Sequence, residues 1–206
     1  MTSVSSVARL FRSVTAIVLA AGGSTRFGSP KQLHLYNGQS LIERAVNAAA
    51  DAGADPVIVV LGAEADAIRH AINDSQTRII VNANWSEGLA SSLATGMNAV
   101  DAACDAILVT LADQPLVDAN TLRRLIAVFD AQHRIVASGY NGTVGVPAIF
   151  GVEFRHALSQ LNGDAGAGHW LRERLGDVTV VRLDEGGIDV DTPSDTVRLE
   201  ETMIHE

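Results

Sequence analysis

Short apolar runs alternate along the chain with longer segments in which apolar residues recur at helical spacing. The runs are rich in branched side chains, and the first is closed by Gly22 and Gly23, a pattern typical of buried strands. Seven such runs predict strands: residues 15–21, 56–61, 78–81, 106–111, 134–137, 144–150 and 178–182.

The segments between these runs predict helices: residues 40–52, 64–73, 88–101, 118–131 and 193–203. Ser40 and Asp118 stand where side chains cap helices, and Glu43 completes a capping box with Ser40. This alternation predicts parallel βαβ units, and therefore an α/β fold with three αβα layers and a mostly parallel, Rossmann-like sheet. Ligands of such sheets bind outside the carboxyl ends of the strands, so the residues that follow strands are the candidates for a site.

Composition limits the architecture and the function classes. The 206 residues are enough for one domain with a substantial core, and 47% apolar against 19% charged residues favours a folded chain. We expect a flexible tail over residues 1–13 and a single domain over residues 14–206. The net charge of −9, without a cluster of Lys and Arg, argues against a nucleic-acid partner.

Two observations in the sequence indicate the cellular compartment of the protein. Cys104 is the only cysteine, so the chain has no internal disulfide and fits a reducing environment. The apolar run over residues 16–21 is far shorter than the roughly 20 residues that span a bilayer. We therefore expect a cytoplasmic protein that does not interact with a membrane.

A glycine-rich loop follows the first predicted strand: Gly22, Gly23, Ser24, Thr25, Arg26, Phe27, Gly28, Ser29, Pro30 and Lys31. Glycines let backbone N–H groups approach an anion closely, and Arg26 and Lys31 add two cations. The loop therefore predicts a phosphate-binding site, although an ordinary strand–helix turn has the same spacing. The dinucleotide pattern G-x-G-x-x-G is absent. The P-loop pattern fails because Lys31 lies two residues late and Gln32 is neither Ser nor Thr.

Carboxylates lie at two further positions of interest. Asp113 comes directly after the strand over 106–111, where it could bind Mg²⁺, which prefers oxygen ligands. The alternative is a helix cap, but Asp118 is better placed for that role. Asp189 and Asp191 lie on one face of an extended segment because side chains alternate with a period of two.

The loop also carries a resemblance to a known family. Residues 19–31 read Leu-Ala-Ala-Gly-x-Ser-x-Arg-Phe-Gly-x-x-Lys, which resembles the signature of the MobA-like NTP transferases and, within them, of the molybdenum cofactor cytidylyltransferases. Further matching motifs follow in order at residues 84–96, 111–115, 145–147, 163–167 and 189–195. The resemblance implies a fold like that of the nucleotide-diphospho-sugar transferases.

The resemblance also implies roles for individual residues. The triphosphate would be held by the loop residues Leu19, Ala20, Ala21, Gly22, Gly23, Ser24, Arg26 and Lys31. Ser92 would contact the base, and Asp113 and Asp189 would hold Mg²⁺, with Asp191 in reserve and Asp195 in a structural role. Cytidylyltransferases tend to read Leu-Ala-Ala-Gly where guanylyltransferases read Leu-Ala-Gly-Gly, so Ala21 favours CTP.

The expected activity is transfer of a cytidylyl group from MgCTP to the phosphate of molybdopterin, for a client molybdoenzyme, with Arg26, Lys31 and Asp113 as catalytic residues. Three alternatives stay open: GTP or another phosphorylated acceptor, a non-catalytic molybdopterin-binding chaperone, and a nicotinamide-dependent oxidoreductase, which the missing dinucleotide pattern disfavours. Residues 145–147 and 163–167 are expected at the acceptor. Relatives often have Arg where this chain has Gly168, so either the acceptor differs here or Arg172 or Arg174 substitutes for that arginine.

Overall fold

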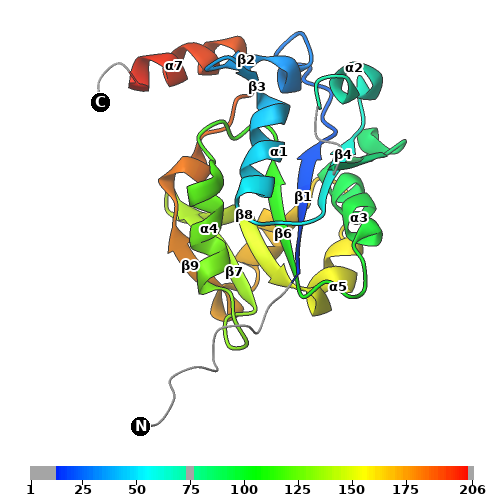
Figure 1. Cartoon of the computed structure of the whole chain (residues 1–206), viewed down its shortest axis with the longest axis vertical. Coiled ribbons are helices and arrows are strands. Elements are labelled where there is room, and N and C mark those ends of the chain that lie inside the picture. Colours follow the sequence, from blue (N-terminus) through cyan, green and yellow to red (C-terminus); the bar gives the residue numbers. More distant parts are fainter. Residues whose placement is uncertain (1–12, 73–76, 204–206) are drawn as a thin grey trace.

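The structure is a computed structural model that describes residues 13–72 and 77–203. The expected tail over residues 1–13 lies, apart from Ser13, outside the described residues. Within them, seven strands form one central sheet (Figure 1): β1 Val14–Ala20, β4 Val57–Leu61, β5 Thr77–Val81, β6 Ala106–Leu111, β7 Ile135–Tyr140, β8 Thr143–Gly151 and β9 Thr179–Arg182.

The strands are ordered β5-β4-β1-β6-β8-β7-β9, and only β8 runs antiparallel to its neighbours in the sheet that the structure describes. The predicted mostly parallel sheet is therefore confirmed. The antiparallel step comes from a tight turn at Asn141 and Gly142, both with positive φ, which joins β7 to β8 as a hairpin.

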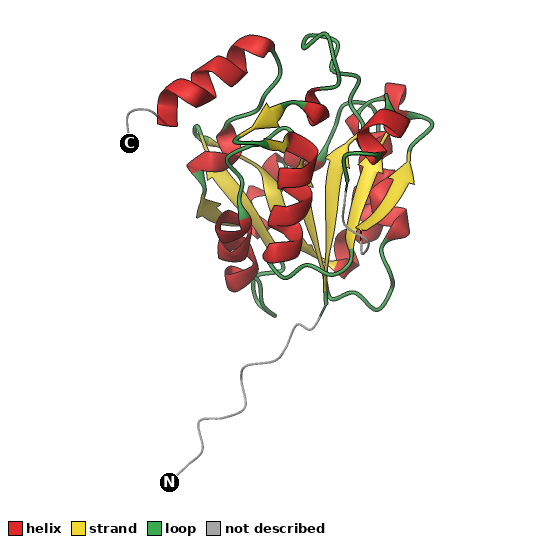
Figure 2. Ribbon diagram, turned by 45° about the horizontal axis from the view of Figure 1, so that its top comes forward, coloured by secondary structure: helices red, strands yellow, loops and turns green. Residues whose placement is uncertain are grey.

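Helices cover both faces of the sheet (Figure 2). Their bounds are α1 Leu41–Asp51, α2 Ala65–Arg69, α3 Leu89–Ala99, α4 Ala119–Val128, α5 Arg155–Ser159, α6 Ala167–Arg172 and α7 Pro193–Met203. Short 3-10 helices span Lys31–Leu33, Trp85–Glu87, Val152–Phe154, Leu175–Asp177 and Asp184–Gly187, and a small hairpin pairs β2 Leu35–Tyr36 with β3 Gln39–Ser40. The three-layer αβα architecture is thus as predicted.

Local sequence explains where the longer helices begin. The Ser40 hydroxyl accepts a hydrogen bond from the Glu43 backbone N–H, and the Glu43 carboxylate accepts one from the Ser40 backbone, which forms the predicted capping box. The Asp118 side chain accepts a bond from the Thr121 N–H at the start of α4. The helix predicted over 64–73 is shorter in the structure, where α2 ends at Arg69. The helix predicted over 118–131 also ends earlier, because α4 ends at Val128.

Alternate residues of each strand build two separate cores. In β1, Ala16 and Val18 pack beneath α1 and α4, whereas Ile17 and Leu19 pack beneath α3. A third, smaller cluster contains Tyr36 of the small hairpin, Leu41 of α1, Leu199 of α7 and Val190 of the segment before α7. No described helix is long and apolar enough to cross a membrane.

The third cluster sets the position of the segment before α7. Figure 1 shows α7 and the β2–β3 hairpin over the end of the sheet to which the arrowhead of β1 points. Val190 is fully buried there, and its N–H donates to the Asp113 carbonyl at 2.9 Å. Residues 189–191 are therefore held against the carboxyl end of β6.

Candidate active site

A cavity of about 360 Å³ opens at the carboxyl ends of β1 and β6, a size within the range of small-molecule sites. It is lined by Leu19, Ala20, Ala21, Gly22, Gly23, Lys31, Gln32, Trp85, Ser86, Gly88, Leu89, Ser92, Leu111, Ala112 and Asp113. Of the predicted site residues, the structure thus brings together eight: Leu19, Ala20, Ala21, Gly22, Gly23, Lys31, Ser92 and Asp113. Ser24, Arg26 and Asp189 are not among the lining residues.

Gln32 fixes the start of the glycine-rich loop from beneath. Its side chain is 3% exposed, and its Nε2 donates to the carbonyls of Ala20 and Gly22, at 3.0 Å each. The carbonyl between them, that of Ala21, accepts from the Ala63 N–H at 3.1 Å. Three consecutive carbonyls are therefore held in place. In the sequence, Gln32 stands out only as a mismatch to the P-loop, and its role cannot be read from spacing.

The outer part of the loop turns around Ser24, whose φ of 51° is left-handed. Its carbonyl accepts from the N–H groups of Phe27 and Gly28, and its hydroxyl accepts from the Lys31 N–H at 3.2 Å. The backbone N–H groups of residues 22–26 make no hydrogen bond to any residue of the described ranges. Free, closely spaced amides of this kind form an anion-binding concavity, so Ser24 shapes the loop that the sequence predicted to hold phosphate.

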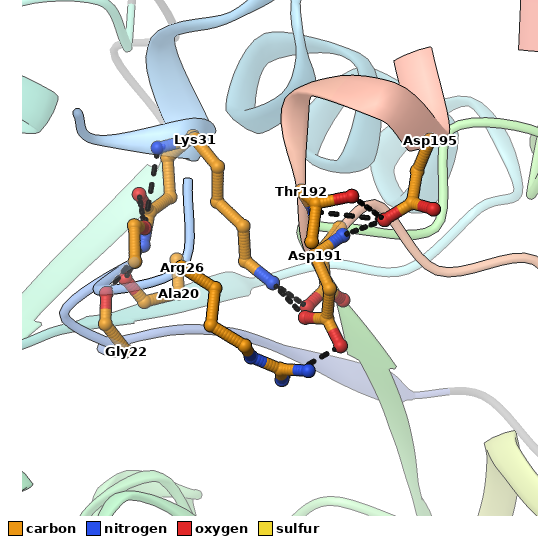
Figure 3. Close-up of polar contacts among 10 residues, drawn as sticks. Ala20, Gly22, Arg26, Lys31, Asp191, Thr192 and Asp195 are labelled. Carbon is orange, nitrogen blue, oxygen red and sulfur yellow. Dashed lines mark hydrogen bonds and ion pairs between the residues drawn. The ribbon is translucent and has the colours of Figure 1, made fainter. Parts of the chain in front are cut away.

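Two cations meet carboxylates at the mouth of the cavity (Figure 3). Lys31 Nζ lies 2.6 Å from Asp113 Oδ2 and 2.9 Å from Asp191 Oδ1, and Arg26 Nη2 lies 2.8 Å from Asp191 Oδ2. The Lys31 side chain is 12% exposed and that of Arg26 is 71% exposed. Burial lowers the pKa of Lys31, but the charge of Asp113 and the bonds to both carboxylates outweigh it and hold the pKa above its ordinary value. The Lys31 ammonium is therefore a positive charge held in one position, whereas the Arg26 guanidinium is a positive charge at the exposed edge of the site.

Asp191 is oriented by the first turn of α7. The Asp195 carboxylate accepts bonds from the backbone N–H groups of Asp191 and Thr192, at 3.1 and 2.7 Å, and from the Thr192 hydroxyl at 2.8 Å (Figure 3). Asp195 thus has the structural place expected of it. The hydrogen bond from Lys31 holds the pKa of Asp191 below its usual range, so this carboxylate stays ionised and paired.

Asp189 has the opposite electrostatic surroundings. The residue as a whole is exposed, but its carboxyl group is partly enclosed, and this burial, followed by the negative charge of Asp113, raises its pKa to about 6. Asp113 Oδ1 is itself buried without a hydrogen-bond partner. Asp113 is paired with Lys31 through Oδ2 alone, and Asp189 lies near its negative charge, so the two carboxylates are suited to a divalent cation.

The described side chains do not by themselves form a complete metal-binding site. Among residues 13–72 and 77–203, no group of three or more His, Cys, Asp or Glu side chains is arranged to hold a metal ion. Mg²⁺ is commonly bound in a different way, by one or two carboxylates together with substrate phosphates and water. The carboxylates of Asp113 and Asp189 fit such a site, and the role of each as a metal ligand stays a prediction.

The far wall of the cavity is built on α3. Ser92 lines the cavity with 3% exposure, and the buried Asn82, which directly follows β5, donates to its hydroxyl. Trp85 packs against the loop, since a Cβ on Gly23 would lie 3.1 Å from the indole ring. The sequence predicted Ser92 but missed Asn82, although its place after a strand end was the available signal.

The segments expected at the acceptor flank this cavity without lining it. The Gly163 carbonyl accepts from the Ala90 N–H at 3.0 Å, and a Cβ on Gly88 would lie 2.5 Å from that carbonyl. A Cβ on Gly145 would lie 2.2 Å from the Tyr140 hydroxyl, so only glycine permits this approach. These segments therefore lie beside the cavity, and their role toward an acceptor stays a prediction.

Arg172 and Arg174 point to different places. A Cβ on Gly168 would lie 3.2 Å from Arg172 Nη1, so the guanidinium occupies the space beside Gly168. Burial raises the pKa of Tyr140, Asp189 raises it further, and Arg172 lowers it, which places both charges near this phenol. Arg174 instead lies over the Trp170 ring, 4.4 Å from its centroid. Of the two, Arg172 faces the Asp189 side of the site.

Comparison with known proteins agrees with this geometry. A family model described as the MobA-like NTP transferase domain matches residues 16–178. Nicotine blue oxidoreductase of Paenarthrobacter nicotinovorans is 36% identical over 90% of this chain and 96% of that protein.

Solved structures give the same picture. The crystal structure of Rv0371c from Mycobacterium tuberculosis H37Rv is 36% identical, with a TM-score of 0.80 over 93% of this chain and 100% of that one, and its complex with manganese is also similar, at 33% identity and a TM-score of 0.79. A nucleotidyl transferase from Methanothermobacter thermautotroptrophicus is 25% identical, with a TM-score of 0.78 over 94% of this chain and 98% of that one.

Proposed function

Because the chain belongs to the MobA-like NTP transferase family, a family of nucleotidyltransferases, we propose that it transfers a cytidylyl group from MgCTP to the phosphate of molybdopterin and releases pyrophosphate. The observation that carries the proposal is the meeting, in one cavity, of the immobilised Ala21 backbone with Lys31 and Asp113. The product would pass to a client molybdoenzyme in the cytoplasm.

The choice of CTP depends on Ala21. A single methyl group can exclude a larger base only if the backbone that carries it cannot move. Gln32 holds the carbonyls on both sides of Ala21, and Ala63 holds that of Ala21 itself. Ala21 is 6% exposed and lines the cavity. This fixed wall supports a pocket that takes a pyrimidine in preference to a purine.

The free amides of residues 22–26 and the charges of Lys31 and Arg26 suit the triphosphate. A phosphate oxygen of the acceptor would attack the α-phosphorus in line. The new P–O bond forms as the bond between the α-phosphorus and its bridging oxygen breaks, and pyrophosphate leaves with that oxygen. Lys31 is positioned to neutralise the charge that develops on the leaving group.

The metal would add to this charge stabilisation. Mg²⁺, when held by Asp113 and Asp189, supplies positive charge to the phosphate oxygens. The unpartnered Asp113 Oδ1 supports this assignment. If the D113A variant kept full Mg²⁺-dependent activity, the assignment would be wrong.

On the acceptor side, Arg172 is the residue suited to bind the phosphate of the acceptor. It replaces the arginine that relatives often have at the place of Gly168, since the two positions lie four residues, about one helical turn, apart on α6. Arg174 is turned toward Trp170 and is not suited to this role.

The decisive experiment measures pyrophosphate release with each of the four nucleoside triphosphates, with and without molybdopterin, and identifies the product by mass. Release with CTP alone, and only when the pterin is present, is the expected result. Release with GTP would change the nucleotide, and release with a different phosphorylated acceptor would change the acceptor. Binding of the pterin without any release would favour a non-catalytic chaperone.

A second candidate function comes from the relative in Paenarthrobacter nicotinovorans. Its name as an oxidoreductase, at 36% identity over 90% of this chain, favours testing reduction of nicotine blue or a related dye. Loss of the blue colour with NADH or NADPH, unaffected by the D113A variant, would support an oxidoreductase. The Lys31–Asp113 pair next to the glycine-rich loop favours nucleotidyl transfer instead.

A further inference from the structure

Asn82 is a buried polar residue to which neither the sequence nor the proposed reaction gives a role. It is 5% exposed, directly follows β5, and its backbone N–H donates to the Leu61 carbonyl at 2.8 Å. Its side-chain Nδ2 donates to the hydroxyls of Ser91 at 2.9 Å and Ser92 at 3.1 Å. A buried amide with these contacts is a fixed part of the cavity wall.

The orientation of the Asn82 amide is determined by its neighbours. The Asn84 backbone N–H, which can only donate, lies 2.9 Å from one end of the amide, so that end is the oxygen. The other end is therefore the NH₂ group, and its two protons are directed to the two serines. A flipped amide would place two donors against each other.

The hydroxyl protons of Ser91 and Ser92 differ in whether the described part of the protein offers them an acceptor. The Ser91 hydroxyl lies 2.9 Å from each of the Asn84 and Gly88 carbonyls, so the protein itself accepts its proton. The Ser92 hydroxyl accepts from Asn82 and has no acceptor for its own proton among the described residues. Because Ser92 lines the cavity, the network ends in one hydroxyl proton available to a ligand.

We propose that Asn82 fixes Ser92 as a hydrogen-bond donor, so that the pocket selects a base that presents an acceptor to this wall. The inference rests on the proposed function, in which this cavity holds the nucleotide. On its Watson–Crick edge cytosine carries two adjacent acceptors, O2 and N3, whereas guanine carries two adjacent donors, N1–H and N2–H, and a single acceptor, O6. Asn82 is thus a positioning residue for base selection, and it acts through Ser92.

The test reverses the polarity of this hydrogen bond. In the N82D variant the new carboxylate, of nearly the same shape, accepts from Ser92 and cannot donate to it. The Ser92 proton then points away from the cavity, and its lone pairs face the base. S92A removes the hydroxyl altogether. S91A is the matched control, because it removes a bond to the same amide but no group that faces the cavity.

Dissociation constants for MgCTP and MgGTP are measured by calorimetry, together with the melting temperature of each variant. S92A is expected to weaken CTP binding about tenfold, and S91A less than about threefold. N82D is expected to weaken CTP binding at least as much as S92A and to weaken GTP binding less, so that the CTP-to-GTP preference falls about tenfold or more. A purely structural role of Asn82 would lower both affinities equally.

The outcomes separate this inference from the proposed reaction. If the wild-type chain prefers another triphosphate, the cytidylyl proposal fails, and the same three variants are measured with that nucleotide. Equal losses in S91A and S92A would overturn the inference. So would an N82D variant that folds, as its melting temperature shows, and keeps the wild-type nucleotide preference. If N82D does not fold, the inference is judged from the CTP affinities of S92A and S91A. A larger loss in S92A than in S91A supports it, and equal losses overturn it.

Discussion

The two ends of the candidate site are built in different ways. At the nucleotide end, the buried amides of Gln32 and Asn82 each hold several loop or helix groups, and Lys31 is fixed between two carboxylates. At the proposed acceptor end, the side chains of Tyr140 and Arg172 donate only to backbone carbonyls within the described part of the chain, and Arg172 is exposed. A region whose side chains are held by many hydrogen bonds suits a ligand that a whole family shares. A region with few side-chain hydrogen bonds can change in sequence between relatives that use different acceptors.

Replacement of Lys31 is the strongest test of the nucleotide end. K31A removes a largely enclosed cation that lines the cavity, and it leaves Asp113 and Asp191 without their shared counter-charge. We expect kcat/KM for CTP to fall about 100- to 1000-fold, measured by pyrophosphate release. R26A is the matched comparison. Its side chain is 71% exposed, and we expect a loss of only about tenfold. Equal losses would contradict the distinction between the two cations.

Replacement of Gln32 tests the rigidity of the loop. Q32M keeps the approximate volume but leaves the carbonyls of Ala20 and Gly22 without a donor, which lowers the free energy of unfolding by about 1–3 kcal/mol. Because the backbone at Ala21 is then free to shift, we expect the KM for CTP to rise about tenfold and discrimination against GTP to weaken. Chemical denaturation and steady-state kinetics measure the two effects, and unchanged discrimination would show that Ala21 does not depend on this anchor.

Replacement of Arg172 tests the acceptor end alone. R172A is expected to raise the KM for the acceptor about tenfold and to leave the KM for CTP unchanged, because Arg172 lies on the Asp189 side of the site. R172K should recover part of the loss. The R174A variant serves as the control, since Arg174 lies over Trp170. An equal effect of R172A and R174A on acceptor binding would refute the assignment.

The smallest expected effect concerns Asp189. Its pKa of about 6 exceeds the ordinary 3.8, so the folded state binds the proton more tightly, and stability declines as the pH rises from about 4 through 6. In EDTA, D189N is expected to raise the melting temperature by about 2 °C at pH 8 and to have no effect at pH 4, the small size reflecting solvent screening at this exposed residue. A stabilisation that is the same at both pH values would show that ionisation of Asp189 beside Asp113 is not its cause.

The sequence predicted elements whose signals are local. Continuous apolar runs predicted the strands, and the Ser40–Glu43 and Asp118 caps predicted where α1 and α4 begin, because these bonds span only three residues. It did not predict α5 and α6, which are short and are stabilised by packing against α3 and β8. Nor did it reveal the β7–β8 hairpin, although Asn141 and Gly142 are a typical turn pair.

The part of the site that lies at the carboxyl ends of strands could be predicted from the sequence. Lys31, Asp113 and the first two loop glycines, Gly22 and Gly23, line one cavity, as expected from the carboxyl ends of β1 and β6. Gln32 and Asn82 escaped prediction because their partners are backbone carbonyls and hydroxyls that only folding brings near. The pairing of Lys31 with Asp191, 160 residues away, likewise depends on the packing of α7.

The Lys31–Asp191 pair has a consequence for how a nucleotide enters. A phosphate group that binds Lys31 in the place of Asp191 exchanges one counter-ion for another, because the carboxylate already neutralises this cation. Such an exchange changes the local net charge little, and the affinity therefore depends on ionic strength less steeply than at a site with bare cations. We expect a lone phosphate or sulfate to compete poorly with the tethered Asp191, and a polyphosphate that brings its own metal ion to compete better. The Lys31–Asp191 pair would thereby favour ligands of high charge over single anions at this loop.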